Sequence, residues 1–451
     1  MAGIALSSLS PRMARSRYVA LLFAALCFAR EGARADISID VTKGNAEPVV
    51  VALPYPAAPN PGAQQVGDDI IEVAEGDLNG SGFFRSADRT AFLQKFNSDA
   101  DIPRFPNWQM LGAAVVVASS AQINGSSVTF NYRLWDVYSQ RQILGKQFTT
   151  DAANARRIGH ILADAVYEAL TGEKGYFDSR IAYVAESFDG RRKHKRIAIM
   201  DQDGANNAYV TNGAELVLTP RFSPDGRKLL YVGYAGGVNP SLYLVNIERG
   251  GVGARIGGSG GMAFSPNFAP GGNEAALAVS QNGNSDIFIS NLQGDMRRIT
   301  NHTAIDTSPS FSPDGSRIVF SSDRAGSPQI YVMNRGGGGE ARLSYGDGDY
   351  NTPVWSPKGD YVAFTKRDKG QFYIGVMRPD GSQERLLTSS YLDEGPAWSP
   401  NGRLLVFARQ SPGGRGRPGA SDLYVVDLAG NHLRRVSTPG EASDPTWAYM
   451  P

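Results

Sequence analysis

The sequence is poor in the residues that build covalent cross-links and metal sites. It has one cysteine and four histidines in 451 residues. The single cysteine, Cys27, lies in an N-terminal apolar segment, and without that segment the chain has neither a disulfide nor a thiolate. No pair of histidines or cysteines stands at the spacing of a metal site. We therefore expect no cofactor, no metal ion and no catalytic cysteine.

Long hydrophobic runs and a dominant charge are also missing. The formal net charge is +1, from 45 basic and 44 acidic residues, so no general attraction to nucleic acid or to acidic membranes is implied. The main apolar run, Tyr18 to Ala29, is shorter than the roughly 20 residues that a membrane-spanning helix needs. We expect no nucleic-acid partner and no direct membrane span.

The N-terminus has the features of an export signal. Three arginines precede the apolar run, and Ala33 and Ala35 place small residues at positions −3 and −1 of a cleavage site. We predict that residues 1–35 are a signal peptide, cleaved between Ala35 and Asp36. Cys27 does not mark a lipoprotein, because the large Leu26 precedes it.

Glycine is abundant, with 52 residues, and much of it belongs to an internal repeat. An aromatic residue followed by Ser-Pro and a Gly turn begins at Phe222, Phe311, Trp355 and Trp398, with a weaker copy at Phe268. Proline, Asp or Asn, and Gly each favour a tight turn. The copies recur at intervals in the forties, which is typical of a β-propeller with one blade per repeat.

The two ends of the repeat region lack complementary parts. Strands near residues 180–184 and 196–200 have no inner strand before them, and the inner strand near 446–448 has no outer strands after it. We infer that these segments complete one four-stranded blade. The sequence therefore predicts an all-β, six-bladed propeller over residues 178–451, closed by the C-terminal strand. Trp355, Trp398 and Trp447 stand at equal repeat positions, which indicates inter-blade core.

Residues 36–174 predict a small α/β domain with an N-terminal arm. Apolar patterns predict strands at 49–53, 112–118, 128–134 and 142–148, with a hairpin turn at Asn124-Gly125. Helices are expected over 64–78 and from Asp151, as N-cap, to Gly172. His160 stands beside the apolar stripe of the second helix and is interpreted as a packed or capping residue.

Two matches to known site motifs are better explained otherwise. Gly257 to Gly261 fits a hydrolase nucleophile elbow around Ser259, but it lacks the strand-to-helix context of that motif. Residues 77–88 resemble a calcium loop, but Asp88 stands where a bidentate Glu is required. We predict no catalytic and no metal-binding residue.

Two charged stretches are also assigned to turns. Asp201 and Asp203 precede Gly204 and predict a hairpin turn. The basic cluster at 191–196 predicts a solvated hairpin tip, with phosphate or lipid head groups as the alternative contact.

A set of local sequences carries a family resemblance. They are Gly76-Asp-Leu78, Ser81-Gly-Phe-Phe84, Leu134-Trp-Asp-Val137, residues 156–164, Tyr167–Gly172 and Gly175–Val184. In this order, ahead of the repeats, they resemble the TolB family of periplasmic propeller proteins of the Tol-Pal system. The resemblance covers nearly the whole mature chain, and three stretches depart from it as loop variation: 189–196, 250–261 and 413–419.

The resemblance implies binding without catalysis in the periplasm of a Gram-negative bacterium. The propeller would dock the peptidoglycan-associated lipoprotein Pal, and the N-terminal arm would engage the inner-membrane protein TolA. Such a system maintains the outer membrane and helps it follow constriction during cell division. The resemblance further implies a monomer within a larger complex, with other outer-membrane lipoproteins as candidate partners.

The arm is the first candidate partner site. Apolar and polar residues alternate along it. Its residues are Asp36, Ile37, Ser38, Ile39, Asp40 and Val41. The alternation alone favours an edge strand of the first domain, whereas the resemblance implies a strand that docks in one partner state and is released in another.

The propeller rim is the second candidate partner site. The loops ahead of the repeat prolines should line the mouth of the central channel, and they mix carboxylates, an aromatic and small polar groups. The chosen residues are Asp306, Thr307, Tyr350, Asn351, Asp393 and Glu394. The alternative is that they are solvated turn residues that cap strand ends.

Two other functions stay open at this point: a periplasmic propeller that binds a small ligand, and a propeller-bearing hydrolase. The lack of a catalytic domain after the repeats argues against the hydrolase. A small ligand could occupy the central channel, so the sequence does not exclude a periplasmic propeller that binds a small ligand.

Overall fold

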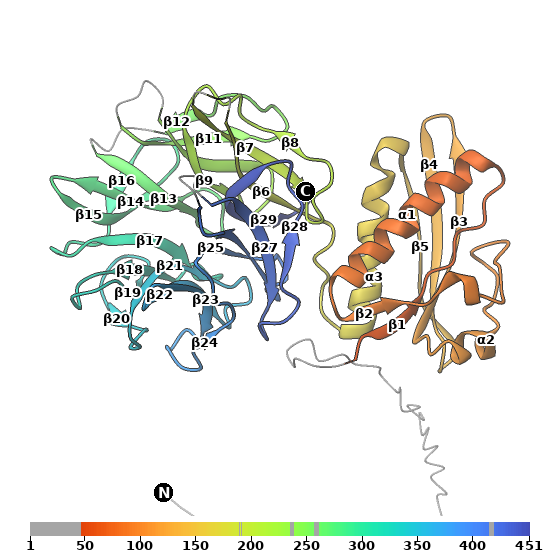
Figure 1. Ribbon diagram of the computed structural model, residues 1–451. Coiled ribbons are helices and arrows are strands. Elements are labelled where there is room, and N and C mark those ends of the chain that lie inside the picture. Colours follow the sequence, from red (N-terminus) through yellow and green to blue (C-terminus); the bar gives the residue numbers. More distant parts are fainter. Residues whose placement is uncertain (1–46, 189, 191, 235–238, 257–260, 415–418) are drawn as a thin grey trace, which may run out of the picture. The chain divides into compact units, whose positions relative to one another are not determined.

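The computed structural model describes residues 47–188, 190, 192–234, 239–256, 261–414 and 419–451 (Figure 1). The predicted cleavage site, the arm residues 36–41 and Ser259 lie outside the described residues. Among the helices that are described, none is long and apolar enough to cross a membrane.

The first part of the described chain is an α/β region built on one sheet of order β2-β1-β3-β4-β5 (Figure 1). β1 pairs in parallel with β2 and β3, and the other neighbours pair antiparallel. The strands are β1 (Val49–Ala52), β2 (Phe84–Ser86), β3 (Val115–Asn124), β4 (Ser127–Asp136) and β5 (Arg141–Asp151). The helices are α1 (Pro61–Gly80), η1 (Arg89–Ala91), α2 (Phe105–Met110), η2 (Ala152–Asn154) and α3 (Ala155–Thr171).

The helices α1 and α3 cover one face of this sheet. Ile70 of α1 and Leu162 of α3 are buried against Val117 and Phe130 of the strands. On the other face, Val116 belongs to a second core cluster with Phe96 and Trp108. Successive side chains of β3 therefore pack alternately into two cores, as expected for a strand that is covered on both faces.

The helix ends follow local capping rules, with one shift from the prediction. The Asn60 side chain accepts a hydrogen bond from Ala63 N, and Pro61 begins α1. Asp151 was expected to cap the long second helix, but it caps the short η2 turn by accepting from Ala153 N, and α3 begins after it at Ala155. Gly172 ends α3 with φ 71°, as predicted.

Six four-stranded antiparallel sheets follow, and they form the six blades of the predicted propeller. The blade of β29 (Glu441–Tyr449) contains β6 (Ser179–Phe188), β7 (Lys193–Asp201) and β8 (Ala208–Tyr209). The next two contain β9 (Val217–Phe222), β10 (Lys228–Gly233), β11 (Ser241–Asn246) and β12 (Ala254–Ile256), then β13 (Met262–Phe268), β14 (Ala275–Gln281), β15 (Asn284–Ser290) and β16 (Met296–Arg298).

The remaining three blades repeat the same order. They contain β17 (Asp306–Phe311), β18 (Arg317–Ser322), β19 (Gln329–Asn334) and β20 (Ala341–Arg342), then β21 (Asp349–Trp355), β22 (Val362–Asp368), β23 (Gln371–Met377) and β24 (Arg385–Leu386), and finally β25 (Leu392–Trp398), β26 (Leu404–Gln410), β27 (Ser421–Asp427) and β28 (Arg434–Val436).

The ring is closed as the sequence predicts. The last strand, β29, lies beside β6 (Figure 1) and is hydrogen-bonded to it. In this pairing, Trp447 lies opposite Ile181. Trp355, Trp398 and Trp447 are only 5–7% exposed. Trp398 donates its indole N–H to Val354 O of the preceding blade at 2.9 Å. The equivalent tryptophans are therefore inter-blade core.

The repeated Ser-Pro-Asp-Gly phrase forms the turn between the first two strands of a blade. Gly315 N donates to Ser312 O at 2.8 Å, and Gly315 has φ 69°. The Ser312 hydroxyl donates to Asp314, and it accepts from Arg317 N at 3.0 Å. Ser312, Asp314 and Gly315 thus each have a local structural role in the turn, so we assign the phrase to the fold and not to a functional site.

Each inner strand carries a bulge just before its repeat proline. The residue that precedes this proline lies in the left-handed region in all six blades: Thr219, Ser265, Ser308, Thr352 and Asp444 have φ between 46° and 53°, and Gly395 has φ 63°. The strand register shifts at these positions. Residues before proline normally favour extended backbone, so the repeated bulge is a strained feature that the blade packing maintains.

Candidate functional site

The six predicted rim residues separate into two groups. Asp306, Tyr350 and Asp393, each three residues before a repeat proline, are fully buried, at 0% exposure. Their immediate successors are more open: Thr307 and Asn351 are half-buried and Glu394 is exposed. Both members of each pair stand in regular strand register before the bulge, so the alternation of a β-strand places one side chain on the buried face and the next on the open face.

The buried carboxylates are paired within their own blades. Arg324 donates two hydrogen bonds to Asp306, both at 3.0 Å. These two bonds share the single nitrogen Nη2, whereas Arg409 uses two nitrogens, Nε and Nη2, to donate to the two oxygens of Asp393, both at 2.7 Å. Bidentate pairs of this kind are strong and geometrically specific. These two aspartates therefore fix the start of the inner strand and have their charge balanced inside the blade.

Tyr350 occupies the equivalent position in the blade between them. Its hydroxyl accepts from Lys366 Nζ at 2.7 Å and donates to Glu384 Oε1 at 2.8 Å. Burial and the hydrogen bond to Glu384 raise the pKa of Tyr350 above its ordinary value. This phenol is thus a neutral bridge between a cation and an anion of the same blade.

Exposed apolar side chains surround the start of the inner strands. Inner strands of successive blades all run in the same direction, so the residues just before them share one face of the propeller. In five blades, a large apolar side chain is exposed at the first residue of the inner strand or within four residues before it: Leu216 (41%), Met262 (43%), Ile305 (48%), Tyr345 (74%) and Tyr391 (55%). Phe188, 69% exposed, ends β6 beside the start of β29. We call these six residues the apolar ring.

The apolar ring was missed in the sequence, although a signal for it exists. Leu216, Met262 and Ile305 each stand four residues before a repeat proline. Recurrence of apolar residues in a loop, where polar ones are the norm, marks a face that binds another molecule.

Charged residues lie on the inner strands inside this ring. Glu394 is exposed as a whole residue, but neighbouring protein atoms partly desolvate its carboxylate, and this desolvation together with the nearby carboxylate of Asp444 raises the pKa of Glu394. Burial lowers the pKa of Arg221, while Asp444 acts in the opposite direction. Arg221 also donates to Pro220 O at 2.8 Å. The channel side of the propeller thus combines one cation with two carboxylates that repel each other.

A buried ion network joins α1, α3 and the turn after β7. Asp77 Oδ2 lies 2.6 Å from His160 Nδ1, and Gln202 donates to Asp77 Oδ1 at 2.6 Å. His160 Nε2 lies 3.7 Å from Asp201 Oδ2. Burial opposes the imidazolium charge, but the neighbouring Asp201 carboxylate and the hydrogen bond and charge of Asp77 raise the pKa of His160 to about 10. His160 is therefore a packed histidine, as predicted, and a charged one.

This network overturns any calcium loop at residues 77–88. Asp77 belongs to helix α1, and its two oxygens already accept from His160 and Gln202. Among the described residues, Asp77, His160 and Asp203 are the one group whose ligand-type atoms lie within 4.8 Å of one another. The Arg156 guanidinium pairs with Asp203 and lies 3.5 Å from Asp201. We assign the group to a structural ion network on this ground.

The structure shows what the two other charged stretches, Asp201 to Gly204 and the basic cluster, contact. Asp201 to Gly204 is a hairpin turn, with Gly204 N donating to Asp201 O at 2.9 Å. In the basic cluster, the Lys195 ammonium lies 2.6 Å from the buried Glu186 carboxylate, which also pairs with Lys193. Lys193 also lies 3.4 Å from Glu441, and its side chain is half exposed. Lys195 is therefore held on the sheet and departs from the expected solvated tip, whereas Lys193 is paired but still solvated.

Comparison with known proteins matches both parts of the chain. Residues 37–143 match the TolB amino-terminal domain, and residues 167–450 match the TolB beta propeller domain. The chain belongs to the TolB family. The Tol-Pal system protein TolB of Gluconobacter oxydans is 43% identical over 431 residues, covering 93% of this chain and 91% of that protein. The same protein of Rickettsia conorii is 38% identical over 440 residues, covering 95% and 97%.

A solved structure agrees with the fold. The crystal structure of TolB from Acinetobacter baumannii has a TM-score of 0.76 and 29% sequence identity, covering 90% of this chain and 97% of that one. The resemblance seen in the sequence is thus confirmed, because the matches to the TolB family and to Tol-Pal system proteins cover nearly the whole chain. The signal peptide and the two partner sites stay predictions.

Proposed function

We propose that this chain is a non-catalytic periplasmic scaffold that binds the lipoprotein Pal through the propeller and TolA through the N-terminal arm. The observation that carries the proposal is the apolar ring around the channel mouth. Six large side chains, all more than 40% exposed, lie at the strand ends of a rigid propeller. A patch of this kind with a polar surround has the composition of a protein-docking site.

The ring provides both anchors and polar partners. Tyr345 and Tyr391 are the aromatic members, and aromatic side chains contribute strongly to binding energy at the centre of interfaces. Thr307, Asn351 and Glu394 lie just inside the ring with side chains at least partly open to solvent. Asp306, Tyr350 and Asp393 then serve the same site by fixing the strands that carry these residues.

The arm supplies the second contact of the scaffold. Residues 36–41 alternate between apolar and polar, and they precede β1, which begins at Val49. A strand of this pattern can pair with the sheet edge of another protein, because its backbone N–H and C=O groups can exchange hydrogen bonds with one sheet edge for hydrogen bonds with another. Binding of Pal at the propeller and of TolA at the arm would connect the outer membrane to the inner membrane. This connection maintains the outer membrane and lets it follow constriction during division.

Isothermal titration tests the proposal. The protein that begins at Asp36 is titrated with a soluble Pal domain and, separately, with the periplasmic part of TolA, beside a variant that lacks residues 36–43. We expect saturable one-to-one binding of Pal by both proteins, and loss of TolA binding in the truncated one. Retention of TolA binding without the arm contradicts the arm's role. No Pal binding by folded protein contradicts the docking role and favours a small-ligand function instead.

A further inference from the structure

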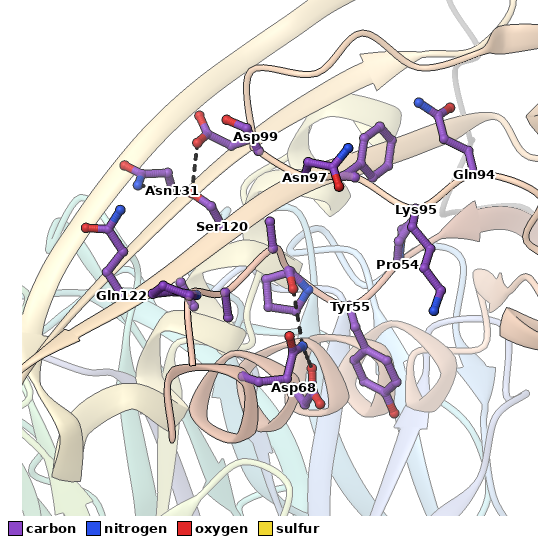
Figure 2. A pocket seen from close by; sticks show the side chains of 18 of the residues that line it. Pro54, Tyr55, Asp68, Gln94, Lys95, Asn97, Asp99, Ser120, Gln122 and Asn131 are labelled. Carbon is purple, nitrogen blue, oxygen red and sulfur yellow. Dashed lines mark hydrogen bonds between the residues drawn. The ribbon is translucent and has the colours of Figure 1, made fainter. Parts of the chain in front are cut away.

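A groove in the α/β region is lined by residues between Pro54 and Asn131 and by no residue of the propeller. Its cavity has a volume of about 820 Å³, within the range of small-molecule sites. Figure 2 shows Asn131, Ser120 and Asp99 along one side and Tyr55 and Asp68 along the other. The inference drawn from this groove does not depend on the proposed function.

The walls of the groove are rigid. Pro54, Pro56 and Pro59 restrict the loop between β1 and α1. This loop is also tied to β3, because Ala57 N donates to Ser119 O and Ala121 N donates to Ala57 O, both at 2.9 Å. A site that is already formed loses little entropy when a ligand binds.

The opposite wall is braced by aromatic packing. Phe92 and Phe96 both line the groove and both pack on Trp108, with ring centroids 5.0 Å and 5.9 Å away. The indole N–H of Trp108 and the backbone N–H of Arg104 both donate to Gln94 Oε1. The segment that carries Gln94 to Asp99 is therefore held on the core beneath it.

Polar groups in the groove are held in place by one another. Asn131 Nδ2 donates to Ser120 Oγ at 3.3 Å, and Ser120 Oγ donates to Asp99 Oδ1 at 2.8 Å (Figure 2). Gln64 donates to Asp68 Oδ1 at 2.7 Å and to Pro56 O at 3.2 Å. Each bond fixes an amide or carboxylate while leaving oxygen lone pairs for a ligand.

Other polar side chains of the lining have no internal partner. Those of Lys95, Asn97 and Gln122 are exposed, and within the part of the chain that the structure describes they make no hydrogen bond and no ion pair. They can donate to and accept from a ligand without first breaking a protein contact. The groove therefore combines fixed acceptors with free donors.

The charge of the lining selects the ligand class. The cations Lys95 and Arg89 face the carboxylates Asp68 and Asp99 in equal number. Arg89 also pairs with Glu75 outside the groove lining, and its guanidinium lies 4.3 Å from the centre of the Tyr55 ring. A balanced lining gives no net attraction to phosphate or to a strongly charged peptide. It suits a neutral ligand with many hydroxyl and amide groups.

We propose that this groove binds a short, uncharged saccharide chain built of N-acetylated amino sugars. Sugar hydroxyls both donate and accept, which matches Asp99, Asn131 and Gln122. The acetamido group matches a side-chain amide, and the apolar face of the sugar ring matches the half-exposed Tyr55 ring, 41% open to solvent. The groove thereby gives the α/β region a binding role of its own.

The test is a titration of the protein that begins at Asp36 with the tetramer of N-acetylglucosamine, followed by chemical-shift changes and calorimetry. Gln122→Ala and Asn131→Ala each remove one groove amide. The matched control is Gln65→Ala, which removes an exposed amide of α1 that bonds Asp69 outside the groove. Thermal unfolding shows that each variant is folded.

We expect saturable binding, weakened at least fivefold by Gln122→Ala and by Asn131→Ala and unchanged by Gln65→Ala. The glucose tetramer, which lacks the acetamido groups, should bind at least fivefold more weakly. No saturable binding, equal affinity for both tetramers, or equal affinity of all folded variants overturns the proposal.

The source of the saccharide is found by competition. Displacement of the bound tetramer by the disaccharide of the cell wall assigns the wall glycan as the source. Displacement only by dephosphorylated amino sugar of lipopolysaccharide assigns the outer-membrane glycolipid, and both results support the ligand class. Displacement by neither overturns it.

Discussion

Trp447 donates its indole N–H to Ser179 Oγ across 2.8 Å, and so joins the last strand of the chain to the first strand of the propeller. The indole is 7% exposed and packs edge-to-face on Tyr176, with ring centroids 5.8 Å apart. Ring closure thus depends on two segments from opposite ends of the repeat region, and the stability of the whole ring should depend on this contact.

Trp447→Ala should lower the free energy of unfolding by about 3–5 kcal/mol, because it removes a buried indole and leaves a cavity between the closing strands. Urea unfolding followed by fluorescence and circular dichroism measures the change. Tyr345→Ala removes an aromatic that is 74% exposed, and as a control it should change stability by less than about 0.5 kcal/mol. A loss below about 1 kcal/mol for Trp447→Ala would show that closure contributes little.

His160→Asn should destabilise the protein by about 3 kcal/mol at pH 7, since it leaves Asp77 buried without its charged partner. The folded-state pKa of His160, about 10, lies above its ordinary value. Between pH 6.5 and 10 the folded state therefore holds a proton that the unfolded state has lost, and the stabilisation falls as pH rises.

The difference in unfolding free energy between the original protein and His160→Asn should thus be full below about pH 6.5 and shrink by at most about 1.4 kcal/mol per pH unit above it. Urea unfolding at pH 6, 8 and 10 measures this trend. A difference that is constant across the series, or that grows with pH, contradicts a charged His160.

Asp393→Ala and Glu394→Ala should have opposite outcomes although the residues are adjacent. Asp393 is fully buried and accepts two hydrogen bonds from Arg409, so its removal leaves a guanidinium uncompensated and should cost about 3 kcal/mol. Glu394 is exposed, so its removal should change stability by less than about 0.5 kcal/mol. Thermal and urea unfolding measure the stability of both variants. Equal losses of unfolding free energy would refute the division of the rim residues into buried and open ones.

Ser308→Gly should keep or slightly raise stability, whereas Ser308→Val should lower it by about 1–2 kcal/mol. Ser308 has φ 53°, and Gly395 occupies the same place in another blade with φ 63°. A left-handed backbone costs a side-chain-bearing residue about 1–2 kcal/mol, and a β-branched one is least suited to it. If valine is tolerated as well as glycine, the bulge is not the strained feature described above.

Tyr345→Ala and Tyr391→Ala should each weaken Pal binding about tenfold, as expected for aromatic anchors that contribute at least 1.4 kcal/mol. Met110→Ala is the matched control, because Met110 is 70% exposed but belongs to α2 of the α/β region. Isothermal titration measures the affinities. An equal effect of all three substitutions would show that the apolar ring is no specific anchor.

The parts of the structure that repeat were predictable from the sequence. The Ser-Pro-Asp-Gly turns and the aromatic before them recur in register, and every copy supports the same blade. Closure by β29 followed from an unmatched inner strand at one end and unmatched outer strands at the other. Local pattern and repeat count were sufficient here, because each blade uses mostly neighbouring segments.

The parts of the structure that depend on residues far apart in the sequence could not be predicted from it. Asp77 and His160 meet across 83 positions, and neither has a local pattern that indicates the other. The bulge at Ser308 contradicts the usual extended backbone before proline, so it could not be inferred. The burial of Asp306 beside the half-buried Thr307 depends on Arg324, which lies 18 positions away in the sequence. The apolar ring was missed because exposure, which gives it meaning, is a property of the assembled blades.

The most direct measurement for the docking role is hydrogen exchange of the propeller with and without a soluble Pal domain. The account predicts slower exchange in peptides that contain residues 301–307, 344–351 and 389–395, which carry Ile305, Tyr345 and Tyr391 of the apolar ring. The Ser-Pro-Asp-Gly turns at 312–315 and 223–226, at the other end of the strands, should be unchanged. Protection at those turns, or none in the three ring segments of a saturated complex, would contradict the account.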